Sequence, residues 1–540
     1  MLLSELLAGV EVNEAPKTDV NIKSLSCNSK SVGECGLYFC LCGTRSDGHD
    51  YAHEALNNGA VAIISERHLP IKLSSNFNNK LSDCAEGDSV ARKGRFMVKG
   101  VYSDVHDRAE KPPFRDNQTP YAQSDAPQVV VKDSRAAMAK ISANFYGNPV
   151  SKMKLICVTG TNGKTTTTYM LRSIGESAGK KVGLIGTTAV YIGEEKRPAD
   201  MTTPDPIALH GIFAEMLQAG CEWVVMEVSA HAIELRKMAG VTADVAVFTN
   251  LSQDHLDFFG TLENYRRAKV SYFSKRYAGL AVINADDATG RLILNTADIP
   301  CYTYGLQLPA DIFAVNGESG ADGQKYVINI LDKIYGITLN LAGKFNMYNS
   351  LAAAGAAFLL GVPLDKIAEG LAALKYVPGR FNTVNLAGKR VVIDYAHTPD
   401  GLKNIIGSIK EFKKGRLITV FGCGGNRDRS KRAIMGEIAG GLSDYAVLTS
   451  DNPRYEDPDL IIAEIERGAQ KSGKPYVCIE NRAEAIAHAV KMAGGEDIIL
   501  ICGKGDEPYQ EIMGVKHPYS DMDTVKRLLK SVKCGVRSVE

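Results

Sequence analysis

The sequence has no long apolar run and no excess of either charge. Lysine plus arginine (63) nearly balances aspartate plus glutamate (62), so no overall field attracts nucleic acid or an anionic membrane. No run reaches the roughly 18 apolar residues that a membrane-spanning helix needs. Residues 1–10 are a poor signal peptide, because Glu5 interrupts a short apolar run that no basic residue precedes. We therefore expect a cytoplasmic protein with no membrane insertion and no nucleic-acid partner.

The twelve cysteines include no C-x-x-C pair. Several of them lie in or beside apolar, strand-like runs. This pattern predicts buried thiols in a reducing compartment and neither a disulfide frame nor a zinc site. The cysteines in question are Cys157, Cys221, Cys423 and Cys502.

The 540 residues exceed what one hydrophobic core holds, and the composition, 45% hydrophobic and 23% charged, is that of an ordinary globular α/β protein. Three domains are expected. They are an N-terminal α/β domain at 1–150, a central domain at 151–378 and a C-terminal domain at 379–540. A polar stretch at about 74–126 is predicted to be an insertion in the first of them.

From about residue 151, short apolar runs alternate with amphipathic stretches, which is typical of parallel sheets covered by helices. Strands are predicted at 155–159, 223–228, 245–249 and 280–284. After a linker at 377–380 the alternation starts again, with strands at 390–393, 417–421, 446–448, 476–479 and 498–501. The predicted fold class is α/β, with a central P-loop-type parallel sheet and a C-terminal Rossmann-like doubly wound domain.

A glycine loop follows the strand at 155–159 and leads into a helix. Its two glycines let backbone amides face a phosphate, the helix N-terminus adds its dipole, and Lys164 supplies a positive charge. Thr165 is placed to offer a hydroxyl to Mg²⁺. A plain Gly/Thr turn is the alternative, but the order of strand, glycines, lysine and threonine favours ATP binding. The loop consists of Gly160, Thr161, Asn162, Gly163, Lys164, Thr165 and Thr166.

Two further candidates end neighbouring predicted strands. Glu227 lies near the carboxyl end of the strand at 223–228, and His255 follows the strand at 245–249. An acid and a histidine at adjacent strand ends, beside a phosphate loop, could hold the magnesium that bridges ATP to an acceptor. A helix-capping glutamate and a core histidine are the alternatives.

Four segments in succession resemble the motifs of the Mur ligases: GTNGKTTT, MEVSAHA, NLSQDHLDFFG followed by YRRAK, and GKFNMYNS. In that family a carboxylate is converted by ATP to an acyl phosphate, and an amine then displaces the phosphate. The resemblance implies that Thr165 and Glu227 hold one Mg²⁺ and that His255 and Lys269 serve a second. The family uses a carbamylated lysine in this role, and the resemblance implies the same for Lys269, since a cationic lysine cannot ligate a metal. An exposed helix lysine is the alternative.

The resemblance also implies contacts to the nucleotide and to a UDP-muramoyl substrate. Asn346 and Asn349 match the family's adenine-side asparagines, while Arg380 and Asp394 match its linker arginine and ribose-side aspartate. Near the N-terminus, Cys27–Val32 and the segment 43–49 resemble the family's uridine-binding domain, with Ser29 as the contact. A surface turn is the alternative there. The dipeptide is expected to meet Thr202, Thr203, Ser229 and either Arg236 or Lys237.

Polar clusters follow three predicted strands of the C-terminal domain, where an α/β domain binds a small ligand. Diaminopimelate differs from lysine by a second carboxylate, whose recognition calls for a guanidinium. The DNPR segment at 451–454 is similar to the diaminopimelate-adding branch, although Asp506 stands where the family usually has histidine. The implied contacts are Arg427, Asp451, Asn452, Arg454, Gly503 and Glu507.

The expected partners are therefore ATP, Mg²⁺, UDP-N-acetylmuramoyl-L-Ala-D-Glu and meso-diaminopimelate, and the expected state is a monomer. An L-lysine-adding enzyme remains an alternative, as does a MurF or folylpolyglutamate-type ligase. From another class, the chain could be a P-loop ATP-binding regulatory protein without ligase activity. Such a protein would not need a second crevice with paired arginines.

Overall fold

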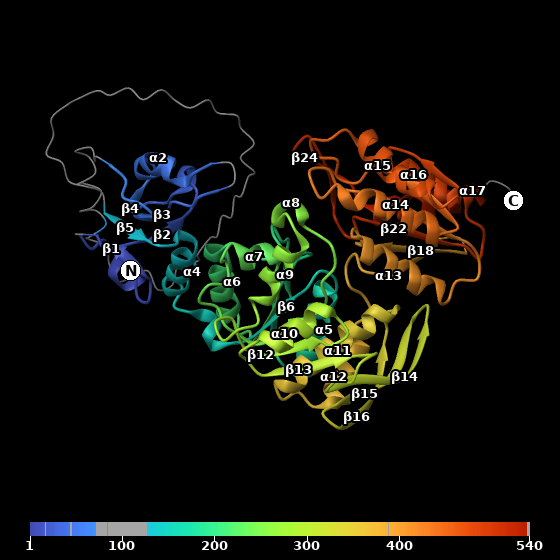
Figure 1. Cartoon of the computed structure of the whole chain (residues 1–540), viewed down its shortest axis with the longest axis horizontal. Coiled ribbons are helices and arrows are strands. Elements are labelled where there is room, and N and C mark those ends of the chain that lie inside the picture. The colour runs from blue at the N-terminus through green and yellow to red at the C-terminus, as the bar shows by residue number, and fades with distance from the viewer. Residues whose placement is uncertain (17, 44–45, 72–83, 85–126, 387, 537–540) are drawn as a thin grey trace. The chain divides into compact units, whose positions relative to one another are not determined.

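The computed structural model describes residues 1–16, 18–43, 46–71, 84, 127–386 and 388–536 (Figure 1). Its strands form a five-stranded, an eleven-stranded and a six-stranded sheet, with one separate two-stranded ribbon. Each of the three large sheets contains parallel neighbours. The predicted α/β class with three sheet-centred parts is confirmed. No helix in the described ranges is long and apolar enough to cross a membrane.

The chain divides into two compact units, and the first comprises 1–155, 203–224 and 231–242. Its sheet has the order β1-β5-β4-β3-β2, with only β1 antiparallel to its neighbour. In β3, Leu37 and Phe39 enter one core while Tyr38 enters the other, as the two-residue period of a strand requires. The strands are β1 Val12–Glu14, β2 Ser24–Ser26, β3 Gly36–Phe39, β4 Ala60–Ser65 and β5 Gln128–Val131; the principal helices are α2 Ala52–Asn57, α4 Ser134–Phe145 and α6 Pro206–Gln218.

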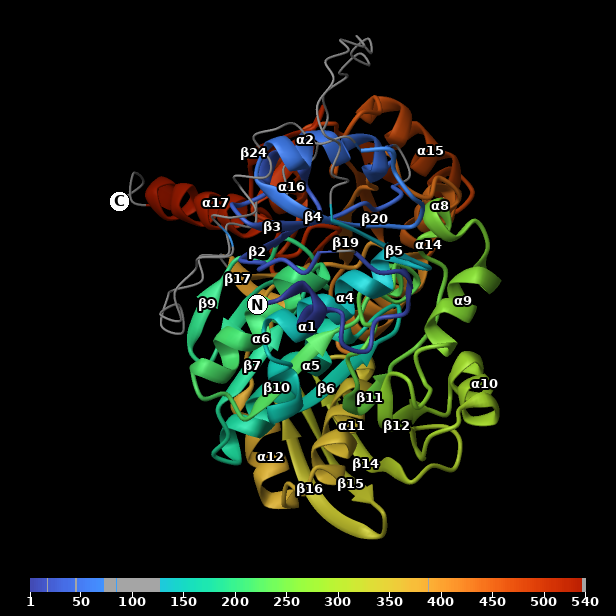
Figure 2. The same cartoon turned by 90° about the vertical axis from the view of Figure 1, so that its left-hand side faces the viewer.

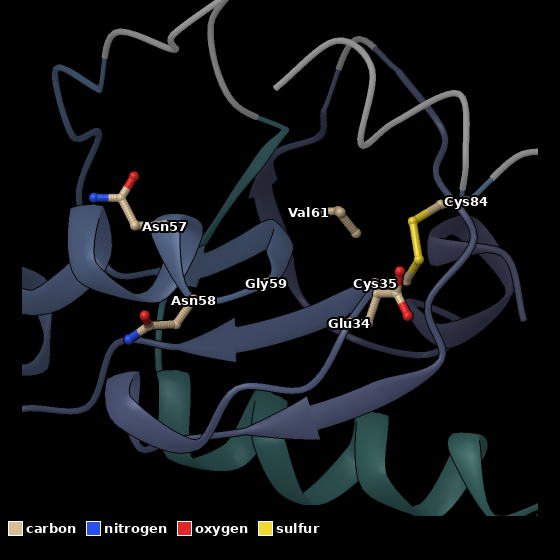
Figure 3. Close-up of a pocket in the computed structure, with 7 residues that line it drawn as sticks. All are labelled: Glu34, Cys35, Asn57, Asn58, Gly59, Val61 and Cys84. Atoms are coloured by element: carbon tan, nitrogen blue, oxygen red, sulfur yellow. A yellow bond between two sulfur atoms is a disulfide. The ribbon is translucent and has the colours of Figure 1, made fainter. Parts of the chain in front are cut away.

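The polar insertion predicted at about 74–126 lies outside the described residues, apart from Cys84. Cys84 forms a disulfide with Cys35, and both cysteines line a pocket with Asn57 and Asn58 (Figure 3). The expectation that the cysteines form no disulfide is therefore wrong for this pair. The two residues are 49 positions apart, and no local spacing rule detects such a pair. The cysteines that the sequence analysis singled out, Cys157, Cys221, Cys423 and Cys502, are free and buried thiols.

The second unit comprises 156–202, 225–230 and 243–540. Its larger sheet has the order β16-β15-β14-β13-β12-β11-β6-β10-β7-β8-β9. The segment from β14 to β16 forms an antiparallel extension that the sequence analysis did not predict, whereas β6, β11 and β12 are parallel and deeply buried. The strands are β6 Lys154–Thr159, β7 Val182–Ile185, β8 Val190–Ile192, β9 Glu195–Arg197, β10 Trp223–Glu227, β11 Ala243–Phe248, β12 Ala278–Asn284, β13 Cys301–Gly305, β14 Ile312–Gly320, β15 Gly323–Ile330 and β16 Lys333–Leu339.

Several helices of this part position functional side chains. Helix α5 (Lys164–Ser177) follows the glycine loop, and α11 (Lys344–Leu359) and α12 (Leu364–Ala373) adjoin it (Figure 2). Helix α7 (Ala230–Glu234) follows β10. Helices α8 (Leu256–Phe259) and α9 (Leu262–Val270) follow β11.

The six-stranded sheet, in the order β17-β18-β22-β19-β20-β21, is parallel except for the edge strand β17. Side chains from α13, α14 and α15 form the core on one face, and side chains from α16 and α17 contribute to the core on the other. This is a doubly wound arrangement, as predicted. The strands are β17 Asn382–Leu386, β18 Lys389–Asp394, β19 Leu417–Phe421, β20 Tyr445–Leu448, β21 Tyr476–Cys478 and β22 Ile498–Cys502; the helices are α13 Pro399–Lys410, α14 Ser430–Leu442, α15 Pro458–Gln470, α16 Arg482–Met492 and α17 Asp521–Val536; and β23 Tyr509–Ile512 and β24 Val515–Pro518 form the separate ribbon.

Candidate functional site

The loop between β6 and α5 can be built only with glycine at two positions. Gly160 has φ +148°, and a Cβ there would lie 1.9 Å from the Thr249 hydroxyl. Gly163 has φ +88°, and a Cβ there would lie 2.4 Å from Asn349 Oδ1. Side chains cannot occupy these places. The glycines therefore let the loop lie against the next strand end and against α11, directly before the start of α5.

Two lysine amines converge on this loop. Lys164 Nζ donates to the carbonyl oxygens of Gly160 and Thr161, at 2.9 and 2.8 Å. Lys269 Nζ donates to the same Gly160 carbonyl at 2.8 Å. Desolvation lowers the pKa of Lys164. It lowers the pKa of Lys269 much further, with a smaller contribution from the nearby charge of Lys164.

Lys269 is 1% exposed although it lies in the short helix α9. The alternative of an exposed helix lysine is therefore excluded. Among the described residues it forms no ion pair; its amine donates to Gly160 O and Thr159 Oγ1 and lies 4.9 Å from the centre of the Tyr265 ring. A buried amine without a carboxylate partner is costly to keep charged.

Glu227, at the end of β10, is 1% exposed. Its carboxylate accepts hydrogen bonds from the Thr187 backbone N–H at 2.8 Å and from the Thr187 hydroxyl at 3.1 Å. The Thr187 hydroxyl also lies 3.0 Å from that of Thr202. Thr202, which sequence analysis assigned to substrate, is thus joined to Glu227 through Thr187. Ser229 lies two residues beyond Glu227, just before α7.

His255 has a 34% exposed side chain, so it is not a core histidine. Its Nε2 lies 3.3 Å from Asp254 Oδ2, and the buried Asp254 also lies near His397 Nε2 (3.6 Å) and Lys431 Nζ (3.4 Å). Burial alone would raise the pKa of Asp254. The nearby His397, Lys431 and His255 instead hold the pKa of Asp254 well below its ordinary value.

The predicted nucleotide residues lie on α11 and at the linker. Asn349 Nδ2 donates to Asn346 Oδ1 at 3.1 Å, and both side chains are buried. Arg380 Nη2 donates to the Thr165 hydroxyl at 3.0 Å. Asp394 accepts hydrogen bonds from the backbone N–H groups of Phe381 and Ala396, and burial raises the pKa of its carboxyl.

The residues assigned to the UDP-muramoyl substrate in the first unit have protein partners. The Ser29 hydroxyl donates to Glu54 Oε2 at 2.5 Å. Lys237 is buried, pairs with Asp205 at 2.9 Å and donates to the Thr203 carbonyl at 3.3 Å.

The neighbouring Arg236 has the more accessible side chain, with 45% exposure, and pairs with Asp133 at 3.2 Å. The residue selected from the sequence, Lys237, is thus the less accessible of the two cations.

The three C-terminal clusters meet at one end of the six-stranded sheet. Asn452 connects them: its Nδ2 donates to Glu507 Oε2 at 2.9 Å, its Oδ1 accepts from Lys504 Nζ at 2.8 Å, and its backbone carbonyl accepts from the Gly425 N–H at 2.9 Å. A Cβ at Gly503 would lie 2.5 Å from Asp451 Oδ2. Burial would raise the pKa of Asp451, but Lys504 and other nearby cations lower it.

The two arginines of these clusters are neighbours. A Cβ at Gly424 would lie 2.9 Å from Arg454 Nη1 and 3.8 Å from Arg427 Cγ. Arg427 is 47% exposed and lies 3.6 Å from Asp257. Arg454 is 21% exposed and is held by the protein through only part of its guanidinium. The site therefore offers two guanidinium groups beside a carboxylate, Glu507.

Each of the three parts of the chain described above matches a known protein family. Residues 21–146, 158–357 and 379–505 match, in this order, the models described as Mur ligase family, catalytic domain; Mur ligase middle domain; and Mur ligase, glutamate ligase domain. The chain is 39% identical over 530 residues to the UDP-N-acetylmuramoyl-L-alanyl-D-glutamate--2,6-diaminopimelate ligase of Caldanaerobacter subterraneus subsp. tengcongensis, which covers 98% of this chain and 99% of the relative.

The chain belongs to the Mur ligase family.

Solved structures of Mur ligases agree. A UDP-N-acetylmuramoyl-L-alanyl-D-glutamate--2,6-diaminopimelate ligase matches with a TM-score of 0.62 and 29% identity, over 95% of each chain. The MurF ligase of Thermotoga maritima in complex with ADP matches with a TM-score of 0.58 and 21% identity, over 94% of this chain and 97% of that one. The second likeness concerns the fold alone.

Sequence analysis missed several side chains of this Mur ligase that contact the predicted ones. Thr187 holds Glu227, and Asp254 joins His255 to Lys431. Asp254 stands next to His255 in the motif NLSQDHLDFFG, so its position could have indicated that it belongs to the site. Thr187 carries no such signal, because it reaches Glu227 from a loop 40 residues earlier.

Proposed function

We propose that this chain is the ATP-dependent ligase that adds meso-diaminopimelate to UDP-N-acetylmuramoyl-L-alanyl-D-glutamate in the cytoplasm, a step of peptidoglycan precursor synthesis. The assembly of Arg454, Asn452, Gly503 and Glu507 at one sheet end carries the proposal. A ligand with a carboxylate and an ammonium at its far end fits neighbouring arginines beside a glutamate. The similarity to UDP-N-acetylmuramoyl-L-alanyl-D-glutamate--2,6-diaminopimelate ligases supports the same reaction.

ATP would bind where β6 passes into α5. Its phosphates would face the loop amides and Lys164, whose amine would exchange the two loop carbonyls for phosphate oxygens. The buried pair Asn346 and Asn349 would face the adenine. Arg380 and Asp394 would meet the remainder of the nucleotide. The proposed loop contacts are Gly160, Thr161, Asn162, Gly163, Thr165 and Thr166.

The donors near the phosphates fit Mg²⁺. Thr165 offers a hydroxyl oxygen and Glu227 a buried carboxylate, and these are the hard oxygen ligands that Mg²⁺ prefers. His255 and Lys269 would serve a second ion. Bound Mg²⁺ would neutralise charge on the transferred phosphoryl group.

Lys269 would serve as a ligand after its amine adds CO₂. The amine nitrogen forms a bond to the carbon of CO₂ and releases one proton, which leaves an anionic carbamate. Burial supports this reaction because it favours the neutral, nucleophilic amine.

The reaction would proceed through two displacements. A substrate carboxylate oxygen attacks the terminal phosphorus of ATP, and ADP leaves. The amine of diaminopimelate then attacks the acyl carbon, inorganic phosphate leaves and the amine loses a proton. Lys164, Glu227, His255 and Lys269 would align these groups and offset their charge, because the chemistry needs positioning more than a nucleophilic side chain.

The dipeptide substrate would be held by hydroxyl and cationic groups. We propose Ser29, which Glu54 orients, for the uridine nucleotide. Thr202, Thr203, Ser229 and Lys237 are proposed for the muramoyl dipeptide. Arg236, next to Lys237 in the sequence, is the more accessible of the two cations.

Arg427, Asp451, Asn452, Arg454, Gly503 and Glu507 would bind diaminopimelate. Arg454 would meet its far carboxylate and Glu507 the accompanying ammonium. We further propose domains at 1–150, 151–378 and 379–540, and a monomeric protein. The three family matches, at 21–146, 158–357 and 379–505, support these bounds.

One assay tests the proposal. The purified chain is incubated with ATP, Mg²⁺, UDP-N-acetylmuramoyl-L-Ala-D-Glu and one amino acid from a panel that includes meso-diaminopimelate and L-lysine. Phosphate release and the mass of the product are measured. We expect phosphate release to require both co-substrates and to be fastest with meso-diaminopimelate. A higher kcat/KM with L-lysine than with meso-diaminopimelate would refute the proposed amino-acid substrate. Intact ATP and no new amide would refute the proposed ligase activity.

A further inference from the structure

Strand β23 is attached to the loop at 451–454 by Gln510, whose Nε2 donates to the Asp451 carbonyl at 2.7 Å, and by Glu511. The backbone N–H of Arg454 donates to the Glu511 carbonyl at 3.1 Å, and the Glu511 N–H donates to Asn452 Oδ1 at 2.9 Å. The Glu511 carboxylate accepts from Arg454 Nε at 3.1 Å. Met513 also donates its N–H to the Arg454 carbonyl at 2.7 Å.

These contacts fix the orientation of the Arg454 guanidinium. A guanidinium has five N–H donors. Nε is directed to Glu511, and Nη1 donates to the Gly425 carbonyl at 2.8 Å. Within the described part of the chain these two are its only hydrogen bonds, so both hydrogens of Nη2 and one of Nη1 remain for a ligand. A ligand carboxylate can therefore bind only at the edge of the guanidinium formed by Nη1 and Nη2.

The backbone of Arg454 is also held in an unusual conformation. Its φ is +52°, a left-handed value that a residue with a Cβ seldom adopts. The bridge between Arg454 and Ile512 of β23 maintains this conformation. Both ends of the arginine, backbone and guanidinium, are thus determined by the same strand.

We propose that Glu511 is a positioning residue for amino-acid specificity, which directs the free edge of the Arg454 guanidinium toward the far carboxylate of the incoming diamino acid. The inference rests on the proposed function, because it takes Arg454 as the residue that meets this carboxylate. Glu511 does not itself contact the ligand carboxylate, since its charge would repel that group.

The proposed positioning role can be distinguished from a purely structural role of the ribbon. The backbone hydrogen bonds of residue 511 remain in any side-chain variant, so the ribbon stays attached. Only the orientation of the guanidinium is released. The affected quantity should then be the KM for diaminopimelate, and not the KM for ATP or for the UDP dipeptide.

The experiment measures these three KM values and kcat for Glu511→Ala, Glu511→Gln and a matched control, Glu437→Ala. The control removes a glutamate from an exposed ion pair with Lys471 in the same domain. Glu511→Ala is expected to raise the diaminopimelate KM about tenfold, since a small displacement of a binding group has an effect of at least this order. Glu511→Gln keeps the shape and one acceptor, so it should recover part of the loss.

A double-mutant cycle completes the test. In an Arg454→Ala background, Glu511→Ala should raise the KM no further, because the group that it orients is gone. A diaminopimelate KM that matches that of Glu437→Ala, or equal losses in both backgrounds, would overturn the inference. If Glu511→Ala does not fold, Glu511→Gln decides by the same criteria. A wild-type chain that makes no amide from diaminopimelate would instead refute the proposed function itself.

Discussion

Replacing Arg454 by alanine should remove most of the preference for diaminopimelate over L-lysine. Two of the five guanidinium donors are engaged with Glu511 and Gly425, and the rest are available for a ligand carboxylate. L-lysine has no second carboxylate, so it gains nothing from these donors. The substitution should therefore act on one amino acid and not on the other.

The size of the effect follows from the bonds that are lost. A hydrogen bond to a charged group contributes about 1.5–3 kcal/mol, and each 1.4 kcal/mol is about tenfold in affinity. The loss of one such bond thus predicts a 10- to 100-fold higher KM for diaminopimelate. The effect should lie near the upper end of this range, because Glu511, 16% exposed, would be left unpaired near the ligand carboxylate.

Phosphate release at saturating ATP and UDP dipeptide, with each amino acid titrated in turn, measures the two kcat/KM values. Arg454→Lys serves as a second variant, since it keeps the charge without the planar fork, and should fall between wild type and alanine. Equal losses of kcat/KM for diaminopimelate and L-lysine would show that the loop is merely distorted. An unchanged diaminopimelate KM would show that Arg454 does not meet the carboxylate.

Three further outcomes are expected. Lys269→Ala should lower kcat by about two orders of magnitude, with recovery by short carboxylic acids but not by bicarbonate; full activity without additives would contradict the carbamate. Asp521→Asn removes the negative charge that pairs with the fully buried Arg482 at 2.8 Å. Urea unfolding should show a free energy of unfolding lower by about 3–5 kcal/mol, and a decrease below about 1 kcal/mol would contradict the buried-pair argument. Burial lowers the pKa of His210 to about 4, so between about pH 6.5 and 4 the unfolded chain binds a proton that the folded chain does not. The free energy of unfolding should therefore fall by up to about 3 kcal/mol as the pH drops through this range. His210→Gln should reduce that fall, which denaturant midpoints at several pH values would measure.

The parallel strands could be predicted from the sequence because both of their faces are covered. Every residue of Leu417–Phe421 is buried, and all but Thr419 are apolar. The antiparallel strands β14 to β16 have no such run. Most residues of Lys333–Leu339 are exposed, and the strand shows no clean alternation of apolar and polar residues. The local sequence therefore gave no reason to place a strand there.

The site was predictable where its residues follow one another in a motif. The glycine loop and the DNPR segment are of this kind. Partners that the fold brings from far along the chain carry no such signal. Glu511 lies 57 residues from Arg454, and Cys84 lies 49 residues from Cys35. In both cases the interaction depends on tertiary structure, which a single sequence does not specify by spacing.

The Asn452 amide has a consequence for changing the amino acid that is added. Because one small group is held simultaneously by Lys504, Glu507 and the strand of Glu511, none of these segments can shift without the others. Redesign for another diamino acid would therefore have to alter several loops at once, and substitutions introduced singly would give poor guidance to their combined effect.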